Sequence, residues 1–87
     1  MPWKDTLEHM LDIDIPVADL ARWEATAKRL EPVTAAVIIQ ISGLHSDPSK
    51  RRIGRAANAA RYAANIADEP LKTEAVALAE ELERWSV

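Results

Sequence analysis

Five prolines, at positions 2, 16, 32, 48 and 70, divide this chain of 87 residues into segments of helical length. Proline has a fixed φ and no backbone N–H, so it suits the first turn of an α-helix and disrupts the interior of one. The spacing therefore predicts one helix after each proline, over residues 3–13, 16–30, 32–44, 48–67 and 70–85.

Apolar side chains within these segments recur in steps of three and four, which is the spacing of one helix face. The second and fifth segments show this at Leu20, Trp23, Ala27 and Leu30 and at Leu71, Ala75, Leu78, Leu82 and Trp85. The fourth segment has a face of mostly small side chains, at Ile53, Ala57, Ala60, Ala63, Ala64 and Ala67. Because small side chains let another backbone approach closely, we expect the fourth and fifth helices to pack as an antiparallel pair.

Residues 32–44 contain no charged side chain, although the segments on both sides are rich in charge. Several are β-branched, so local propensity also allows a strand over residues 37–41. The sequence offers no second strand-like run, and an unpaired buried strand would leave backbone groups without hydrogen bonds. We therefore predict an apolar helix that ends near Gly43 and is enclosed by the other helices or by a second copy of the chain. Strand exchange in a dimer is the alternative.

The composition favours a single all-α domain over residues 1–87. Alanine dominates the apolar residues, there are 2 glycines, and phenylalanine is absent, which favours helices over a sheet. With 48% hydrophobic and 29% charged residues, the chain is of the globular type. We predict a compact bundle of four to five short helices, each starting near a proline, around the central apolar helix.

Cysteine is absent, which excludes disulfides and thiolate zinc sites and makes the cytoplasm the simplest location. The N-terminus has no basic region followed by an apolar run, and residues 32–44 are fewer than the ~20 that span a bilayer. We expect neither an export signal nor a membrane anchor.

The start of the predicted fourth helix breaks a local rule. Lys50, Arg51, Arg52 and Arg55 lie in its first two turns, where the positive end of the helix dipole disfavours cations. Such violations are common at functional sites. With about 100° of rotation per residue, one exposed stripe contains Arg51, Arg55, Asn58, Tyr62 and Asn65, and Lys50, Arg52 and Arg61 lie on its flanks.

Three kinds of partner fit this stripe. Its cations could pair within the chain, with Glu74, Glu80, Glu81 and Glu83 or with Asp5, Glu8 and Asp12. They could bind an acidic surface of another protein. They could also contact nucleic acid, because Arg and Asn bond to bases, Arg and Lys bond to phosphate, and Tyr stacks. A net charge of −3 is unusual for a general phosphate binder, and a helix-turn-helix around Gly43 would bury polar residues such as Ser49 and Arg52.

Catalytic and metal-binding patterns are weak. His45, Ser46 and Asp47 could act as a base and a nucleophile only in a shaped pocket, and residues 46–47 are better explained by helix capping. We interpret the polar face with Asp5, Glu8, His9 and Asp12 as solvated, with a metal site as the alternative. The tryptophans, Trp3, Trp23 and Trp85, fit core packing, although Trp3 and Trp85 near the chain ends could instead mark an intermolecular contact.

The sequence therefore predicts a small non-enzymatic protein-interaction module of a regulatory, inhibitor or adaptor type, with no cofactor and no metal. The residues expected to bind an acidic protein surface are Lys50, Arg51, Arg52, Arg55, Asn58, Tyr62 and Asn65. A nucleic-acid-binding accessory protein that uses the same helix is the alternative. Self-association as a homodimer is a further hypothesis.

Overall fold

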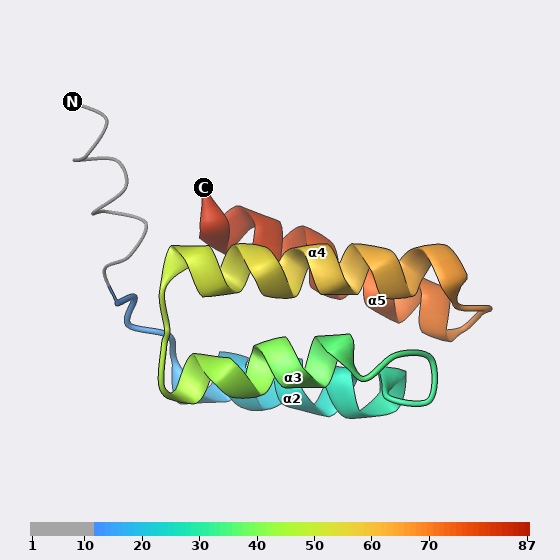
Figure 1. Cartoon of the computed structure of the whole chain (residues 1–87), viewed down its shortest axis with the longest axis horizontal. Helices are drawn as coiled ribbons and strands as arrows, with labels where there is room; N and C mark the ends of the chain where they lie inside the picture. Colours follow the sequence, from blue (N-terminus) through green and yellow to red (C-terminus); the bar gives the residue numbers. More distant parts are fainter. Residues whose placement is uncertain (1–11) are drawn as a thin grey trace.

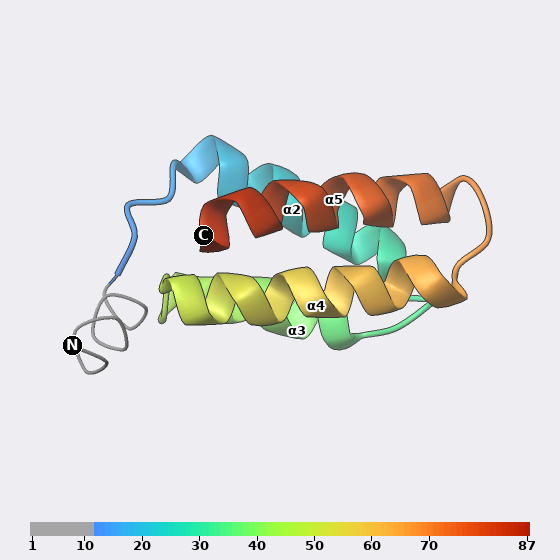
Figure 2. The same cartoon turned by 90° about the horizontal axis from the view of Figure 1, so that it is seen from above.

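A computed structural model describes residues 12–87, and most of them belong to four packed helices (Figure 1). In chain order these are α2 (Val17–Leu30), α3 (Ala36–Ser42), α4 (Lys50–Ile66) and α5 (Leu71–Ser86), with a 3₁₀ turn, η1 (Gly43–His45), directly after α3. Helices α4 and α5 form one layer of the bundle, and α2 and α3 form the other (Figures 1 and 2). The described part of the chain has no strand, so the predicted all-α bundle is confirmed.

Three of the helices begin where the prolines predict. Pro16 is the N-cap of α2, Pro70 is the N-cap of α5, and α4 follows closely after Pro48. The carbonyl of Pro16 accepts a backbone hydrogen bond from Leu20, which closes the first turn of α2. The fixed φ of proline thus suits these helix starts, and its missing N–H costs nothing there.

The first described residues lie beside the start of α4. Asp12 forms an isolated antiparallel bridge with Ser49, and the amide of Ile13 donates to the carbonyl of Pro48 at 2.6 Å. The predicted helix over residues 3–13 lies outside the described residues except for Asp12 and Ile13, neither of which is helical.

Helix α3 is shorter than the helix predicted over residues 32–44. The amides of Val33 and Thr34 both donate to the carbonyl of Leu30, so these residues form the turn that ends α2. The Thr34 hydroxyl then accepts a hydrogen bond from the amide of Ala36 at 3.2 Å. Pro32 therefore lies in the turn after α2, and α3 begins only at Ala36.

The prediction has α3 enclosed by the other helices or by a second copy of the chain, and in the single chain the other helices cover it only in part. Val37 and Ile41 are fully buried, but Ile39 keeps 61% of its surface exposed. The α-helix ends before Gly43 as predicted, yet this glycine keeps a right-handed helical conformation and continues into η1. One side of the apolar segment thus faces outward in the single chain.

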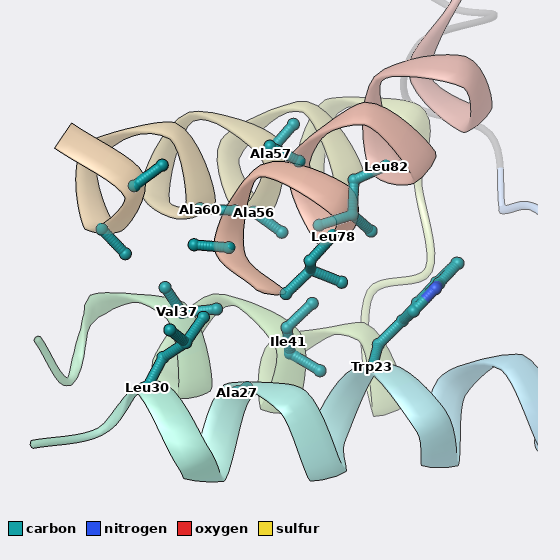
Figure 3. Packing of buried hydrophobic residues seen from close by; sticks show 14 of the residues in the cluster. Trp23, Ala27, Leu30, Val37, Ile41, Ala56, Ala57, Ala60, Leu78 and Leu82 are labelled. Atoms are coloured by element: carbon teal, nitrogen blue, oxygen red, sulfur yellow. The ribbon is translucent and has the colours of Figure 1, made fainter. Parts of the chain in front are cut away.

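The hydrophobic core lies between the two layers (Figure 3). Large side chains of α2 and α3, including Trp23, Leu30 and Ile41, meet a surface of α4 and α5 that is rich in alanine. The buried residues of these two helices are Ile53, Ala56, Ala57, Ala60, Ala63, Ala64, Ala75, Leu78, Ala79 and Leu82. Helices α4 and α5 run antiparallel, as their small side chains predict (Figure 2).

At one end of the core, Trp23 of α2 packs against Trp85 of α5. The ring centroids are 5.8 Å apart and the rings meet edge to face at 83°. This is a favourable arrangement for two aromatic quadrupoles. Both tryptophans therefore pack within the single chain, while Trp3 lies outside the described residues.

Candidate interaction surface

Helix α4 begins at a fixed cap. The Ser49 hydroxyl accepts a hydrogen bond from the amide of Arg52 at 3.1 Å, and Ser49 is buried. Ser49, and not Asp47 of the preceding loop, is therefore the residue that satisfies an amide of the first turn. Because Ser49 also forms the bridge with Asp12, the start of α4 is held to the segment that precedes α2.

The side chains of α4 divide into two faces. The alanine face points into the core, and the residues predicted to form a stripe are all on the outside. We call this outer set the α4 stripe: Arg51, Arg55, Asn58, Tyr62 and Asn65. Tyr62 is 55% exposed, and Ile66, one turn further on, is 49% exposed. Lys50 is half-buried on the flank of the stripe.

Arg52 is engaged within the bundle, unlike the neighbouring Arg51. Its Nη1 donates to Oε1 of Gln40 in α3 at 3.0 Å, and its Nε lies 3.6 Å from a carboxylate oxygen of Asp47. The guanidinium also lies against Gly43, where an added β-carbon would be 3.3 Å from Cζ. This arginine therefore connects α3, the loop and α4.

Arg61, on the other flank, pairs with α5. It donates to both carboxylate oxygens of Glu83, from Nε at 2.8 Å and from Nη2 at 2.7 Å. These hydrogen bonds lower the pKa of Glu83 and raise the pKa of Arg61. Of the internal pairs that the sequence allows for the cations of α4, that of Arg61 with Glu83 is present. Arg52 pairs instead with Asp47 of the preceding loop, a partner that was not predicted.

The remaining cations at the start of α4 differ from Arg52 and Arg61 in their pairing. Within residues 12–87, no ion pair involves Lys50, Arg51 or Arg55. Glu74 and Glu81, which the sequence offers as partners, are instead paired with arginines of α2. The α4 stripe thus combines two cations without a partner in the described chain and three uncharged polar side chains.

A shallow groove of about 270 Å³ runs between α2 and α5. It was not predicted from the sequence, because it depends on the register of the two helices. Arg22 pairs with Glu81 and Arg29 pairs with Glu74 across the groove, and Trp23 lies on its floor. Hydrogen bonds from Arg22 lower the pKa of Glu81. Because the charges on the walls neutralise each other, the groove offers a ligand no unpaired charge.

The loop with His45 shows no catalytic arrangement. Nε2 of His45 lies 2.8 Å from Oε1 of Glu24, whereas the Ser46 hydroxyl donates to the carbonyl of Gly43. The two side chains are therefore used in separate local contacts. Over residues 12–87, His, Asp and Glu side chains nowhere form a group of three that could hold a metal ion. None of the helices described is both long and apolar enough to span a bilayer.

Comparison with protein-family models gives no match. Searches of curated proteins and of solved structures give no match either.

Proposed function

We propose that this chain is a small protein-interaction module that binds an acidic surface of another protein through the α4 stripe. The observation that carries the proposal is the difference among the cations of α4. Arg52 and Arg61 have acidic partners in the bundle, whereas Lys50, Arg51 and Arg55 have none within residues 12–87. Cations at the positive end of a helix are unfavourable, and carboxylates of a partner would offset that cost.

The charge distribution supports the same partner chemistry. Helix α4 contains basic residues and no acidic one, although the whole chain carries a net charge of −3. Arginine binds carboxylates with two parallel hydrogen bonds, and arginine and tyrosine are enriched in protein interfaces. Asn58 and Asn65 extend the polar surface along α4, and Tyr62 adds an exposed aromatic ring.

Reversal of two charges tests the proposal. The Arg51→Glu/Arg55→Glu variant should lose its partner in affinity capture from the source cell, while its circular dichroism and its unfolding temperature stay close to those of the parent chain. The matched control is Lys28→Glu/Arg84→Glu, which changes the net charge equally at exposed positions of α2 and α5. The proposal fails if both variants retain the same proteins, or if the stripe variant unfolds.

Nucleic acid remains the second candidate, because Arg, Asn and Tyr in one line can contact phosphates and bases. Helices α3 and α4 lie side by side and antiparallel, without the steep crossing of a helix-turn-helix (Figure 1). Labelled duplex DNA and single-stranded RNA provide the test at low salt. Binding that weakens steeply with added salt and disappears in Arg51→Glu/Arg55→Glu would favour nucleic acid over a protein partner.

Self-association remains a prediction as well. Ile39 on α3 is the exposed large hydrophobic residue of the charge-free segment, and a dimer that used this face would cover it. Light scattering of the parent chain and of Ile39→Glu measures this directly, because the substitution should dissociate such a dimer. Absence of catalysis and a cytoplasmic location likewise remain predictions from the sequence.

A further inference from the structure

We infer that the segment of the partner that meets the α4 stripe is an amphipathic helix, acidic where it faces the start of α4 and apolar where it faces the end. This inference rests on the proposed function and adds the secondary structure and the residue pattern of the partner. It is carried by the spacing of the stripe and by the change in chemistry along it.

The spacing fits another helix. The five residues of the α4 stripe are four, three, four and three positions apart, which is the spacing of a helix–helix seam. At 1.5 Å per residue the seam is about 21 Å long, with a contact position about every 5 Å. A helix crossing α4 at a shallow angle presents side chains at the same interval. A strand presents them about 6.6 Å apart and would lose register within two or three contacts.

The chemistry changes along the seam. Arg51 and Arg55 occupy its first half, and neither has an acidic partner within residues 12–87. The second half contains Tyr62 and Asn65, and Ile66 lies beside it, with the side chains of Tyr62 and Ile66 both exposed. Carboxylates therefore complement the first two turns of α4, and aliphatic or aromatic side chains complement Tyr62 and Ile66 in the last two. Asn58, between the halves, can fix the register by a hydrogen bond, as buried asparagines do in coiled coils.

The ends of the seam should also respond differently to salt. Arg51 and Arg55 are exposed, so their attraction to carboxylates is screened at physiological ionic strength. Contacts to Tyr62 and Ile66 depend on apolar burial and keep their strength. Added salt should therefore weaken the complex several-fold without abolishing it.

Three peptide probes test the inference. The first is a 21-residue helical peptide with glutamates at the seam positions of one half and leucines at those of the other. The second is a scrambled peptide of the same composition and net charge, in which the glutamates and leucines do not share one helix face. The third is polyglutamate. Fluorescence anisotropy should show the patterned peptide binding at least tenfold more tightly than either control, with ¹⁵N shift changes concentrated on α4.

Substitutions at each end should separate the two contributions. Arg51→Glu/Arg55→Glu and Tyr62→Gln/Ile66→Gln should each weaken the patterned peptide at least tenfold. Val17→Gln, which replaces an apolar side chain that is 86% exposed on α2, is the control. It should leave the affinity for the patterned peptide unchanged.

Equal binding of all three probes, or shift changes on another face, would overturn the helical pattern. So would the absence of binding by the patterned peptide. None of these results would contradict the proposal of an acidic protein partner. That proposal fails only if affinity capture of the partner is insensitive to Arg51→Glu/Arg55→Glu or if this variant unfolds.

Discussion

The guanidinium of Arg52 lies against Gly43, at a point where an added β-carbon would come within 3.3 Å of Cζ. A hydrogen bond to Gln40 completes the contact, so that Arg52 holds the end of α3 to the start of α4. The preceding residue, Arg51, is exposed on the α4 stripe. Two adjacent arginines thus have different surroundings, one in the bundle and one at its surface.

Replacement of each arginine by alanine should distinguish these roles. Arg52→Ala removes a partly buried hydrogen bond made by a charged donor and should lower the free energy of unfolding by about 1–2 kcal/mol. Arg51→Ala should change it by less than about 0.5 kcal/mol, as is usual for surface positions. Urea unfolding followed by circular dichroism measures both values. Equal losses in the two variants would mean that the contacts of Arg52 do not stabilise the fold.

Loss of the α4 cap should also be measurable. Ser49→Ala leaves the amide of Arg52 without its acceptor and should destabilise the protein by about 1 kcal/mol. The control is Ser42→Ala, because Ser42 is exposed and its side chain caps no helix. The urea midpoint should fall for Ser49→Ala with an unchanged m-value. Identical midpoints for the two variants would contradict the role of Ser49.

The alanine face of α4 should reject larger side chains. Ala60 is fully buried in the core that α4 shares with the other helices, so Ala60→Leu should cost about 1–3 kcal/mol through overpacking. Ala25→Leu, at an exposed position of α2, introduces the same side chain without a packing conflict. Thermal unfolding should show a drop of several degrees for Ala60→Leu alone. A stable Ala60→Leu protein would show that the core around α4 can accommodate a larger side chain at little cost.

The ion pair between Arg22 and Glu81 predicts a pH-dependent contribution to the free energy of unfolding. Hydrogen bonds from Arg22 hold the pKa of Glu81 below its ordinary value in the folded state. The stabilisation is therefore complete above the unfolded pKa of about 4.3 and is lost as the pH falls through the lower, folded pKa. Because Arg22 is half exposed, the contribution at neutral pH should be only about 0.5–1 kcal/mol.

Glu81→Gln tests this dependence. The variant should be less stable than the parent chain at pH 7, and the difference should shrink as the pH is lowered from 5 toward 2. Glu31→Gln is the control, since no ion pair within residues 12–87 involves Glu31. A difference that stays constant with pH would assign the effect of Glu81→Gln to packing and not to charge.

Much of the fold could be predicted from proline and alanine positions. Pro16 and Pro70 mark the starts of α2 and α5, because proline fits the first turn of a helix and disrupts the interior. The helix start predicted at Pro32 was wrong, because proline suits a turn as well as a helix start. The decisive contacts are the hydrogen bonds of Val33 and Thr34 to Leu30, which extend the end of α2 and delay α3.

The candidate site could be predicted only in outline. Helical periodicity alone places Arg51, Arg55 and Tyr62 on one exposed line, because that line depends only on the geometry of α4. The surroundings of Arg52 and Arg61 depend on which residues of α3 and α5 lie opposite them. That information is tertiary, and neither charge nor spacing in the sequence contains it.

The two faces of α4 place different demands on its sequence. On the core side, Ala60 and its neighbours leave room for little except small residues. On the opposite side, Asn58 and Asn65 are exposed, so their size is not limited in this way. Substitutions on the outer side can therefore accumulate, or be introduced by design, without repacking the bundle. The same scaffold could in this way be given a different binding preference by changes at five outer positions of a single helix.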